Sequence, residues 1–270
     1  MRALIGHTGF VGGNLQKQTP FDAFFHSRNI EEIAGRDFDL IVCAGAPAEK
    51  WRANADPEKD RVALARLSGA LSTTTARRFV LISTVDVYPL PVEVDERTAI
   101  DRRGGQPYGA NRLALEDAIR TRFTTTVVRL PALFGNGLKK NALFDLLHDH
   151  ETEKIDGRGS FQFYDVERLW QDLGVAVKHG LEILNLVTEP IAIEDIASRF
   201  FGRSLAEKSS PPPRYDVRSV HAHLWQRDDG YQFGAKEVLD SMKAFLEHER
   251  ERARPDGVSS GGSDRPADGG

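Results

Sequence analysis

Gly6, Gly9 and Gly12 recur every three residues near the start of the chain, in LIGHTGFVGGNL (residues 4–15). They lie between an apolar run and the beginning of a helical pattern. Gly6 permits a tight turn, Gly9 lets the backbone approach a pyrophosphate, and Gly12 lets the helix pack closely on the strand. The free amides at the helix N-terminus would then bind the pyrophosphate of a nucleotide cofactor. The alternative is a purely structural turn, because glycines at this spacing also occur by chance.

Apolar runs alternate with helical stretches after this turn. The sequence predicts strands at 3–5, 22–26, 38–44, 79–83 and 125–130, and helices at 57–76 and 108–122. Such alternation is typical of an α/β fold with a doubly wound parallel sheet of the Rossmann type, in which ligands bind at the carboxyl ends of the strands. The glycine turn follows the first strand, so we expect it at that edge of the sheet.

The pattern also predicts how the chain divides into parts. We expect a Rossmann core at residues 1–135, with 161–187 returning to its sheet through strands at 161–165 and 182–187. Residues 136–160 and 188–246 would form a small C-terminal lobe. The tail, residues 251–270, reads ERARPDGVSSGGSDRPADGG and has few apolar residues, so we expect it to be disordered.

The residues after the second strand indicate which dinucleotide would bind. Enzymes that use NAD place an acidic side chain there, about 20 residues past the turn. This chain reads HSRN instead, and Asp22 comes too early, at the beginning of the strand. Ser27 and Arg28 offer a 2′-phosphate a hydrogen-bond donor and a planar cation. We therefore predict NADP, with NAD as the alternative if Arg28 is an ordinary surface charge.

Two later motifs accompany the glycine turn. Residues 79–88, FVLISTVDVY, form an apolar strand that ends in a Ser-Thr pair and a tyrosine, and residues 107–112 read PYGANR. In this order and at these separations, the three motifs resemble the extended short-chain dehydrogenase/reductase superfamily, in its NAD-dependent epimerase/dehydratase group. The resemblance extends over about residues 1–246. It implies that the C-terminal lobe binds the substrate and that the active site lies in the cleft between lobe and sheet.

The resemblance further implies that Thr84 and Tyr108 form the catalytic centre. Hydride transfer at a carbinol carbon requires a proton to leave or reach the oxygen, so the phenol must ionise below its usual pKa of about 10. Thr84 would hold the substrate oxygen, and a nearby cation would lower the pKa of Tyr108. The family has a lysine one helical turn later, where this chain has Arg112, which keeps the charge but cannot relay a proton. Tyr108 could instead be an aromatic side chain packed on the sheet.

The function implied is that of an NAD(P)-dependent oxidoreductase or epimerase acting on a hydroxyl or keto carbon of a sugar or nucleotide sugar. The alternative is a cofactor-binding sensor or scaffold without turnover, which the arginine at position 112 keeps open. The residues expected to contact the cofactor are Gly6, Thr8, Gly9, Phe10, Val11, Gly12, Ser27, Arg28, Ala44, Gly45, Tyr108, Arg112, Leu130 and Pro131.

Departures from the family pattern bear on the substrate. The dehydratase branch has an Asp-Glu pair after the threonine, where this chain has Val85 and Asp86, which argues against a 4,6-dehydratase. Phe161 stands where an arginine often grips the sugar-nucleotide diphosphate. Lys139 and Lys140 could supply that charge or lie on a solvated face. The residues expected to bind the substrate are Thr84, Asp86, Lys139, Lys140 and Asn141.

Composition argues against several other classes. A net charge of −4 over 270 residues, without a basic block, argues against a nucleic-acid partner. The single cysteine, Cys43, lies in an apolar run and is expected to be buried. No run approaches 18 apolar residues, so we expect a soluble, cytoplasmic protein without membrane contact. Histidines such as His148 and His150 are spaced two apart, which on a helix points them to different faces, so no metal site is expected.

The resemblance also implies a homodimer, in which helices 57–76 and 108–122 pack against their symmetry mates. Their apolar positions would serve both the core and the partner. These positions are Ala63, Leu67, Leu71, Leu113, Leu115 and Ile119.

Overall fold

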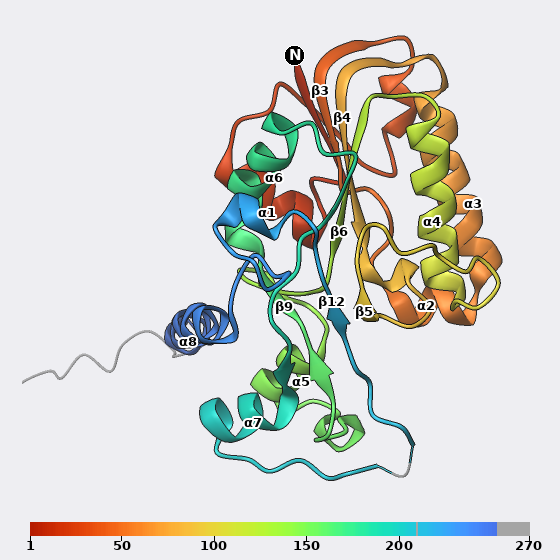
Figure 1. The fold of residues 1–270 in the computed structure, drawn as a ribbon. Coiled ribbons are helices and arrows are strands. Elements are labelled where there is room, and N and C mark those ends of the chain that lie inside the picture. The colour runs from red at the N-terminus through yellow and green to blue at the C-terminus, as the bar shows by residue number, and fades with distance from the viewer. Residues whose placement is uncertain (209, 253–270) are drawn as a thin grey trace, which may run out of the picture.

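A parallel sheet of six strands runs through the centre of the protein, whose computed structural model describes residues 1–208 and 210–252. In spatial order its strands are β10 (Ile183–Asn185), β6 (Thr125–Leu130), β4 (Thr75–Thr84), β3 (Asp37–Cys43), β1 (Arg2–Ile5) and β2 (Ala23–Phe25). The helices are α1 (Phe10–Gln18), α2 (Lys50–Ala55), α3 (Pro57–Ala70), α4 (Pro107–Arg120), α5 (Ala142–His148), α6 (Leu169–Lys178), α7 (Ile193–Phe201) and α8 (Ala235–Arg252). Helices α1 and α6 cover one face of the sheet, and α3 and α4 cover the other (Figure 1). The predicted doubly wound, Rossmann-type sheet is therefore confirmed.

The order of the strands places a ligand crevice beside β1. From β1 the chain goes outward to β2 and then returns to β3 on the other side of β1, so the direction of winding reverses there. In open α/β sheets ligands bind at such a reversal, outside the carboxyl ends of the strands. Gly6 follows β1 at this edge, and Ala44 follows β3.

The strands are apolar because both faces of the sheet are covered. Side chains alternate between the faces, so Leu4, Val42 and Val80 belong to the core cluster beneath α1 and α6. Ile5, Ile41 and Leu81 belong to the cluster beneath α3 and α4, which also contains Cys43. Cys43 is fully buried, as expected, and burial raises the pKa of its thiol to about 11.

Two element boundaries differ from the sequence prediction by four residues or more. The helix expected at 57–76 ends at Ala70, and β4 begins at Thr75 instead of at residue 79. A 3-10 turn, Leu71–Thr73, separates the two elements. Threonine favours strands over helices, and Thr75 pairs with Asp37 at the start of β3. Pairing with β3 therefore places residues 75 and 76, which the pattern had assigned to the helix, in strand β4.

Three pairs of short strands in the described part of the chain lie outside the main sheet. The pairs are β7 (Ala132–Phe134) with β9 (Phe163–Asp165), β8 (Ser160–Phe161) with β11 (Ile191–Ala192), and β5 (Val92–Val94) with β12 (Asp216–Val217). The expected return of 161–165 to the main sheet is therefore wrong, whereas 183–185 does return, as β10. Parallel neighbours need a crossover, and helix α6 separates β9 from β10, so the strand after that helix takes the place beside β6.

Helix α8 ends the described part of the chain and closes one side of the larger core cluster, to which it contributes Val238, Met242 and Leu246. Of the expected tail, residues 251 and 252 belong to this helix, and 253–270 lie outside the described residues. None of the described helices is both long and apolar enough to cross a membrane.

Candidate active site

The three glycines of the N-terminal turn are required for different reasons. Gly6 has a φ of +86°, and a Cβ there would overlap the carbonyl of Ala44. A Cβ on Gly12 would overlap the carbonyl of Gly6, at the point where α1 packs on the turn. Within 4 Å, a Cβ on Gly9 would meet only the carbonyl oxygen of Gly6, at a distance of 3.3 Å. The protein's own packing thus requires Gly6 and Gly12, while the outer face of Gly9 is open to a ligand.

The N-terminus of α1 has the properties of an anion site. Gly9 is the residue before the helix, and no side chain among the described residues caps its amides. The first helical bond runs from Gly13 N–H to the Gly9 carbonyl, which leaves the amides of the first turn free. The first turn carries no acidic residue, and Thr8 and Gly9 are exposed. These residues fit the pyrophosphate of a dinucleotide.

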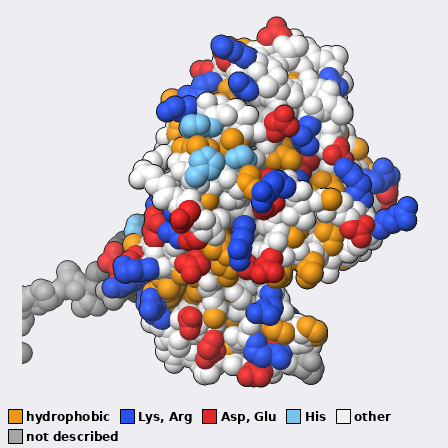
Figure 2. Space-filling view, viewed as in Figure 1, with side chains coloured by type: hydrophobic (Ala, Val, Ile, Leu, Met, Phe, Trp, Pro, Cys, Tyr) orange, Lys and Arg blue, Asp and Glu red, His pale blue; other side chains and the backbone are white. Residues whose placement is uncertain are grey.

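The residues after β2 form a tight turn beside the glycines. Asn29 Oδ1 accepts the amide of His26 at 2.7 Å, and this turn leaves Ser27 and Arg28 exposed. The rings of His7 and His26 lie 5.3 Å apart, a contact that the sequence analysis missed, although His7 belongs to the glycine motif itself. Figure 2 shows histidines gathered on one face of the core.

Asp22 lies at the opposite edge of the sheet. Its carboxylate accepts the amide of Arg2, at the amino end of β1, at 2.6 Å. It is therefore too far back along β2 to serve a ribose, as expected. At the carboxyl ends of the strands, Ala44 and Gly45 follow β3. Leu130 is the last residue of β6, and Pro131 follows it.

Thr84 and Tyr108 are brought to the same edge by a close contact between a turn and a helix. Thr84 is the last residue of β4, and its Oγ1 accepts the amide of Asp86 at 3.1 Å, which starts the 3-10 turn Val85–Val87. A Cβ on Gly109 would overlap the carbonyl of Asp86, so glycine there lets α4 approach this turn. Tyr108, the preceding residue, is thereby placed beside the end of β4.

The hydroxyl of Tyr108 differs from the other tyrosine hydroxyls. The remaining four of the five tyrosines hydrogen-bond through theirs: Tyr88, Tyr164, Tyr215 and Tyr231. Among the described residues the Tyr108 hydroxyl has no partner, although only 9% of the residue is exposed. Within the described residues, the buried side-chain polar atoms without a partner are Arg168 Nε and Thr188 Oγ1, so the Tyr108 hydroxyl is not one of them and is accessible from outside the protein.

Arg112 is placed differently from what its expected role requires. Its guanidinium forms an ion pair with Asp60, donates to the Pro47 carbonyl, and lies 4.0 Å from the centre of the Tyr108 ring. Its side chain is 2% exposed, so it has little access to a ribose. Burial raises the pKa of Tyr108, and the opposing charges of Arg112 and Lys50 do not offset this effect. Arg112 lowers the pKa of Tyr108 as expected, but without cofactor, burial outweighs this effect, and Asp86 and Asp60 add to the raising of the pKa.

Lys50 and Tyr215 join the centre although the sequence analysis did not select either residue. Lys50 Nζ donates to Asp86 Oδ1 at 2.7 Å and lies 3.0 Å from the Tyr215 hydroxyl, which donates to the same oxygen at 2.8 Å. Burial opposes the charge of Lys50, but Asp86 and Tyr215 outweigh it and raise the pKa of the lysine. Tyr215 comes from the segment that leads into β12, and its ring stacks on Phe161 of β8. We call Lys50, Asp86 and Tyr215 the lysine triad.

Comparison with known proteins identifies the fold. No protein-family model and no curated protein sequence matches the chain. Solved structures do match: MoeE5 in complex with UDP-glucuronic acid and NAD has a TM-score of 0.70 at 16% identity, over 93% of this chain and 99% of that one. UDP-glucose 4-epimerase from Thermotoga maritima, with UDP-glucose, has a TM-score of 0.69 at 13% identity (94% and 100%). RMD from Pseudomonas aeruginosa, complexed with NADPH, has a TM-score of 0.68 at 18% identity (92% and 99%).

The chain therefore has the fold of these solved structures. In this fold, the segment after β7 lies beside α1, because Asn14 Nδ2 donates to the Asn136 carbonyl at 2.9 Å. Asn141 caps α5 by accepting the Phe144 amide at 3.0 Å and donates to the Leu133 carbonyl, so its side chain already has a local task. The neighbouring lysines are exposed, and Lys140 lies 3.5 Å from the carboxylate of Asp145 in α5 and 3.4 Å from that of Glu151. Of the residues expected to bind substrate here, Lys140 and Asn141 thus interact with neighbouring residues, and Lys139 is exposed.

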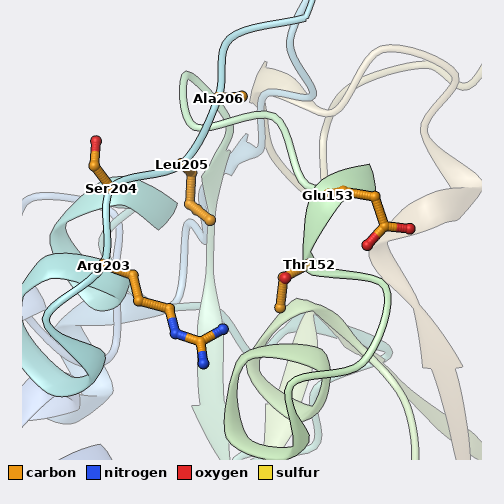
Figure 3. Close-up of a pocket in the computed structure, with 6 residues that line it drawn as sticks. All are labelled: Thr152, Glu153, Arg203, Ser204, Leu205 and Ala206. Carbon is orange, nitrogen blue, oxygen red and sulfur yellow. The ribbon is translucent and has the colours of Figure 1, made fainter.

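A separate pocket opens outside the main sheet (Figure 3). It encloses about 400 Å³ and is lined by Thr152, Glu153, Arg203, Ser204, Leu205 and Ala206. Leu205 packs against the larger core cluster, and Arg203 is paired with Asp149. The pocket is therefore distinct from the centre around Tyr108. No group of three His, Cys, Asp or Glu side chains that could hold a metal ion is found within residues 1–208 and 210–252.

Proposed function

We propose that this protein is an NAD(P)-dependent oxidoreductase or epimerase acting on a hydroxyl or keto carbon of a sugar or nucleotide sugar. The observation that carries the proposal is the free hydroxyl of Tyr108, which lies at the same sheet edge as the uncapped N-terminus of α1. The sequence motifs support it, and so do the structural neighbours, whose bound molecules are UDP sugars and nicotinamide dinucleotides.

In the proposed reaction the protein's own side chains transfer the proton. A bound nicotinamide dinucleotide would supply or accept the hydride at the substrate carbon. Tyr108 Oη donates its proton to a substrate carbonyl oxygen in reduction and receives one from the hydroxyl in oxidation. Thr84 Oγ1 accepts the Asp86 amide and donates a long hydrogen bond, 3.4 Å, to Asp86 Oδ2, which it would exchange for one to the substrate oxygen. Because burial raises the pKa of Tyr108, the phenol is neutral at ordinary pH and is suited to donate in reduction.

We propose NADP as the cofactor, with NAD as the alternative. The exposed guanidinium of Arg28 and hydroxyl of Ser27 support this choice, since a 2′-phosphate prefers charged and neutral donors. Residues 136–160 and 188–246 are proposed as the substrate-binding lobe. Support comes from Tyr215, which the segment before β12 brings against Asp86.

A cofactor-binding protein without turnover is the second candidate. The ion pair between Arg112 and Asp60 favours it, because the expected catalytic cation is neutralised inside the protein. Incubation with NADPH or NADP and a panel of nucleotide sugars, followed by the nicotinamide absorbance, separates the two functions. Turnover that disappears in Tyr108→Phe supports the enzyme. Absence of turnover with every sugar, despite tight NADPH binding, supports the binding protein.

We also propose a homodimer through α3 and α4, with a different set of contact residues. Leu67, Leu71, Leu113, Leu115 and Ile119, which were expected to serve the partner, are buried in the chain's own core. The outer faces instead carry small apolar side chains: Val62, Ala63, Ala110 and Ala114. Small side chains allow helices to approach closely, and light scattering at micromolar concentration tests the dimer.

A further inference from the structure

Loss of its proton would leave Tyr108 as a phenolate, which a nearby cation must stabilise. Asn54 of α2 accepts the Tyr108 amide at 3.0 Å, and Gly109 of α4 packs against the Asp86 carbonyl, so α2 and the turn after β4 both lie beside Tyr108. Four charged groups act on the phenol: Arg112 on α4, Asp60 on α3, Lys50 on α2, and Asp86 after β4. The two cations are not equivalent. The Arg112 guanidinium lies over the face of the Tyr108 ring, and its donors are engaged by Asp60 and the Pro47 carbonyl. These bonds, with one to the Tyr108 carbonyl, hold the guanidinium over the ring, away from the Tyr108 hydroxyl.

Lys50 is in a different situation. Its side chain is 41% exposed, whereas that of Arg112 is 2% exposed, so its ammonium has room to turn. It is the first residue of α2, after the segment that leaves the carboxyl end of β3. Its two bonds in the lysine triad go to Asp86 and to the Tyr215 hydroxyl. Asp86 keeps the hydrogen bond from Tyr215 when Lys50 turns away, so the carboxylate is not left without a partner.

We propose that Lys50, held ready by Asp86 and Tyr215, is the cation that stabilises the Tyr108 phenolate, and that Arg112 is a positioning residue that fixes the ring. This inference rests on the proposed function, because it assigns a role within the same centre. Tyr108 loses the proton of its Oη–H bond to the substrate oxygen and keeps the electron pair. Lys50 then donates a hydrogen bond to that oxygen while remaining an ammonium. Water returns the proton to Tyr108 in the next step.

The charge of Lys50 is permanent under ordinary conditions, because Asp86 and Tyr215 overcome the effect of burial and raise the pKa of the lysine. Its role is therefore electrostatic and differs from a proton relay. Tyr215 is a positioning residue in this scheme. Phe161 stacks on its ring at a centroid distance of 5.8 Å and so anchors the lysine triad to the lobe.

The test is a titration of Tyr108 that needs neither cofactor nor substrate. The ultraviolet absorbance of tyrosinate is followed with rising pH in the full chain, and the curve of Tyr108→Phe is subtracted to isolate Tyr108. Lys50→Met should decrease the ionisation constant of Tyr108 about tenfold, the usual effect of removing one nearby opposite charge. Lys50→Arg retains the charge, so the ionisation constant of Tyr108 should stay close to that of the parent. Lys59→Met removes an exposed lysine on α3 and should leave the curve unchanged.

An unchanged Tyr108 titration in Lys50→Met overturns the proposal, and so does an equal loss in Lys59→Met. Lys50→Met should also retain the far-ultraviolet circular dichroism of the parent, which shows that the fold persists. If the titration shifts as expected but no sugar is ever turned over, the electrostatic role of Lys50 stands and the proposed enzymatic function fails. The two proposals are thereby tested separately.

Discussion

Arg112 and Asp60 form an ion pair inside the protein, with side chains that are 2% and 5% exposed. The pair joins α4 to α3, and Asn111 adds a second bond to the same carboxylate at 2.8 Å. Removing one partner of a buried pair leaves a charge without compensation, which is far costlier than losing a pair in water. The pair is therefore primarily a structural element, and Asp60 holds Arg112 in place over the Tyr108 ring.

Asp60→Asn should decrease the free energy of unfolding by about 3–5 kcal/mol, because the buried guanidinium loses its counter-ion. Urea denaturation of the full chain measures the change. Glu58→Gln is the matched control on the same helix, since the pair of Glu58 with Arg61 is exposed, and its stability should remain close to that of the parent. Equal stability of Asp60→Asn and Glu58→Gln would contradict the structural role. Arg112→Lys should also be destabilised, because one ammonium cannot replace the guanidinium at both Asp60 and Pro47.

Gly9→Val should weaken NADPH binding about 100-fold or more, or about 2.7 kcal/mol, because its side chain fills the open face of the turn. The fold should persist, because the backbone φ of Gly9 is −83°, which valine adopts without strain. Gly13→Ala is the control, since its Cβ would make only an ordinary contact of 3.5 Å with the His7 carbonyl oxygen. Fluorescence titration with NADPH measures both. Parent-like affinity in Gly9→Val would rule out the proposed pyrophosphate site.

Arg28→Asp should reverse the preference between NADP and NAD, because a carboxylate repels a 2′-phosphate and accepts hydrogen bonds from a ribose. The ratio of the two dissociation constants is the measurement. Arg77→Asp makes the same charge change at the exposed start of β4, near the opposite edge of the sheet, and should leave the ratio unchanged. A ratio unaffected by Arg28→Asp would make that arginine an ordinary surface residue.

Tyr108→Phe should reduce turnover about 100-fold or more and leave NADPH affinity intact, since only the proton donor is lost. The pKa of Tyr108 is raised, so the phenol stays protonated through neutral pH. NADPH-dependent reduction that relies on the phenol should therefore be independent of Tyr108 ionisation near neutral pH and fall only above about pH 10. Tyr231→Phe is the control, because its hydroxyl already bonds to Asp216 at 2.5 Å. Loss of the reductive rate near pH 7 through a Tyr108 ionisation would show that the phenol is acidic instead.

Much of the fold was predictable because it depends on residues that are close in sequence. The spacing of Gly6, Gly9 and Gly12 defined the turn, and the structure shows why Gly6 and Gly12 must be glycine. The strands could be predicted from the sequence less evenly than the turn. The short run at 161–165 could not be assigned from its own residues, because pairing with β7 or with β6 would bury the same side chains, and only the position of α6 decides between them.

Sequence alone determined that Thr84 and Tyr108 stand at the end of a strand and the start of a helix, since local patterns specify both positions. Only the tertiary structure decided which charges surround Tyr108. Asp60 lies 52 residues from Arg112, and Lys50 and Tyr215 lie 36 and 129 residues from Asp86. Such pairs are formed when α2, α3 and the lobe pack against the edge of the sheet. The number of available charged partners is too large for spacing to select among them. Both cations are paired with a carboxylate, and the packing determines that the Arg112 side chain is enclosed whereas that of Lys50 is 41% exposed.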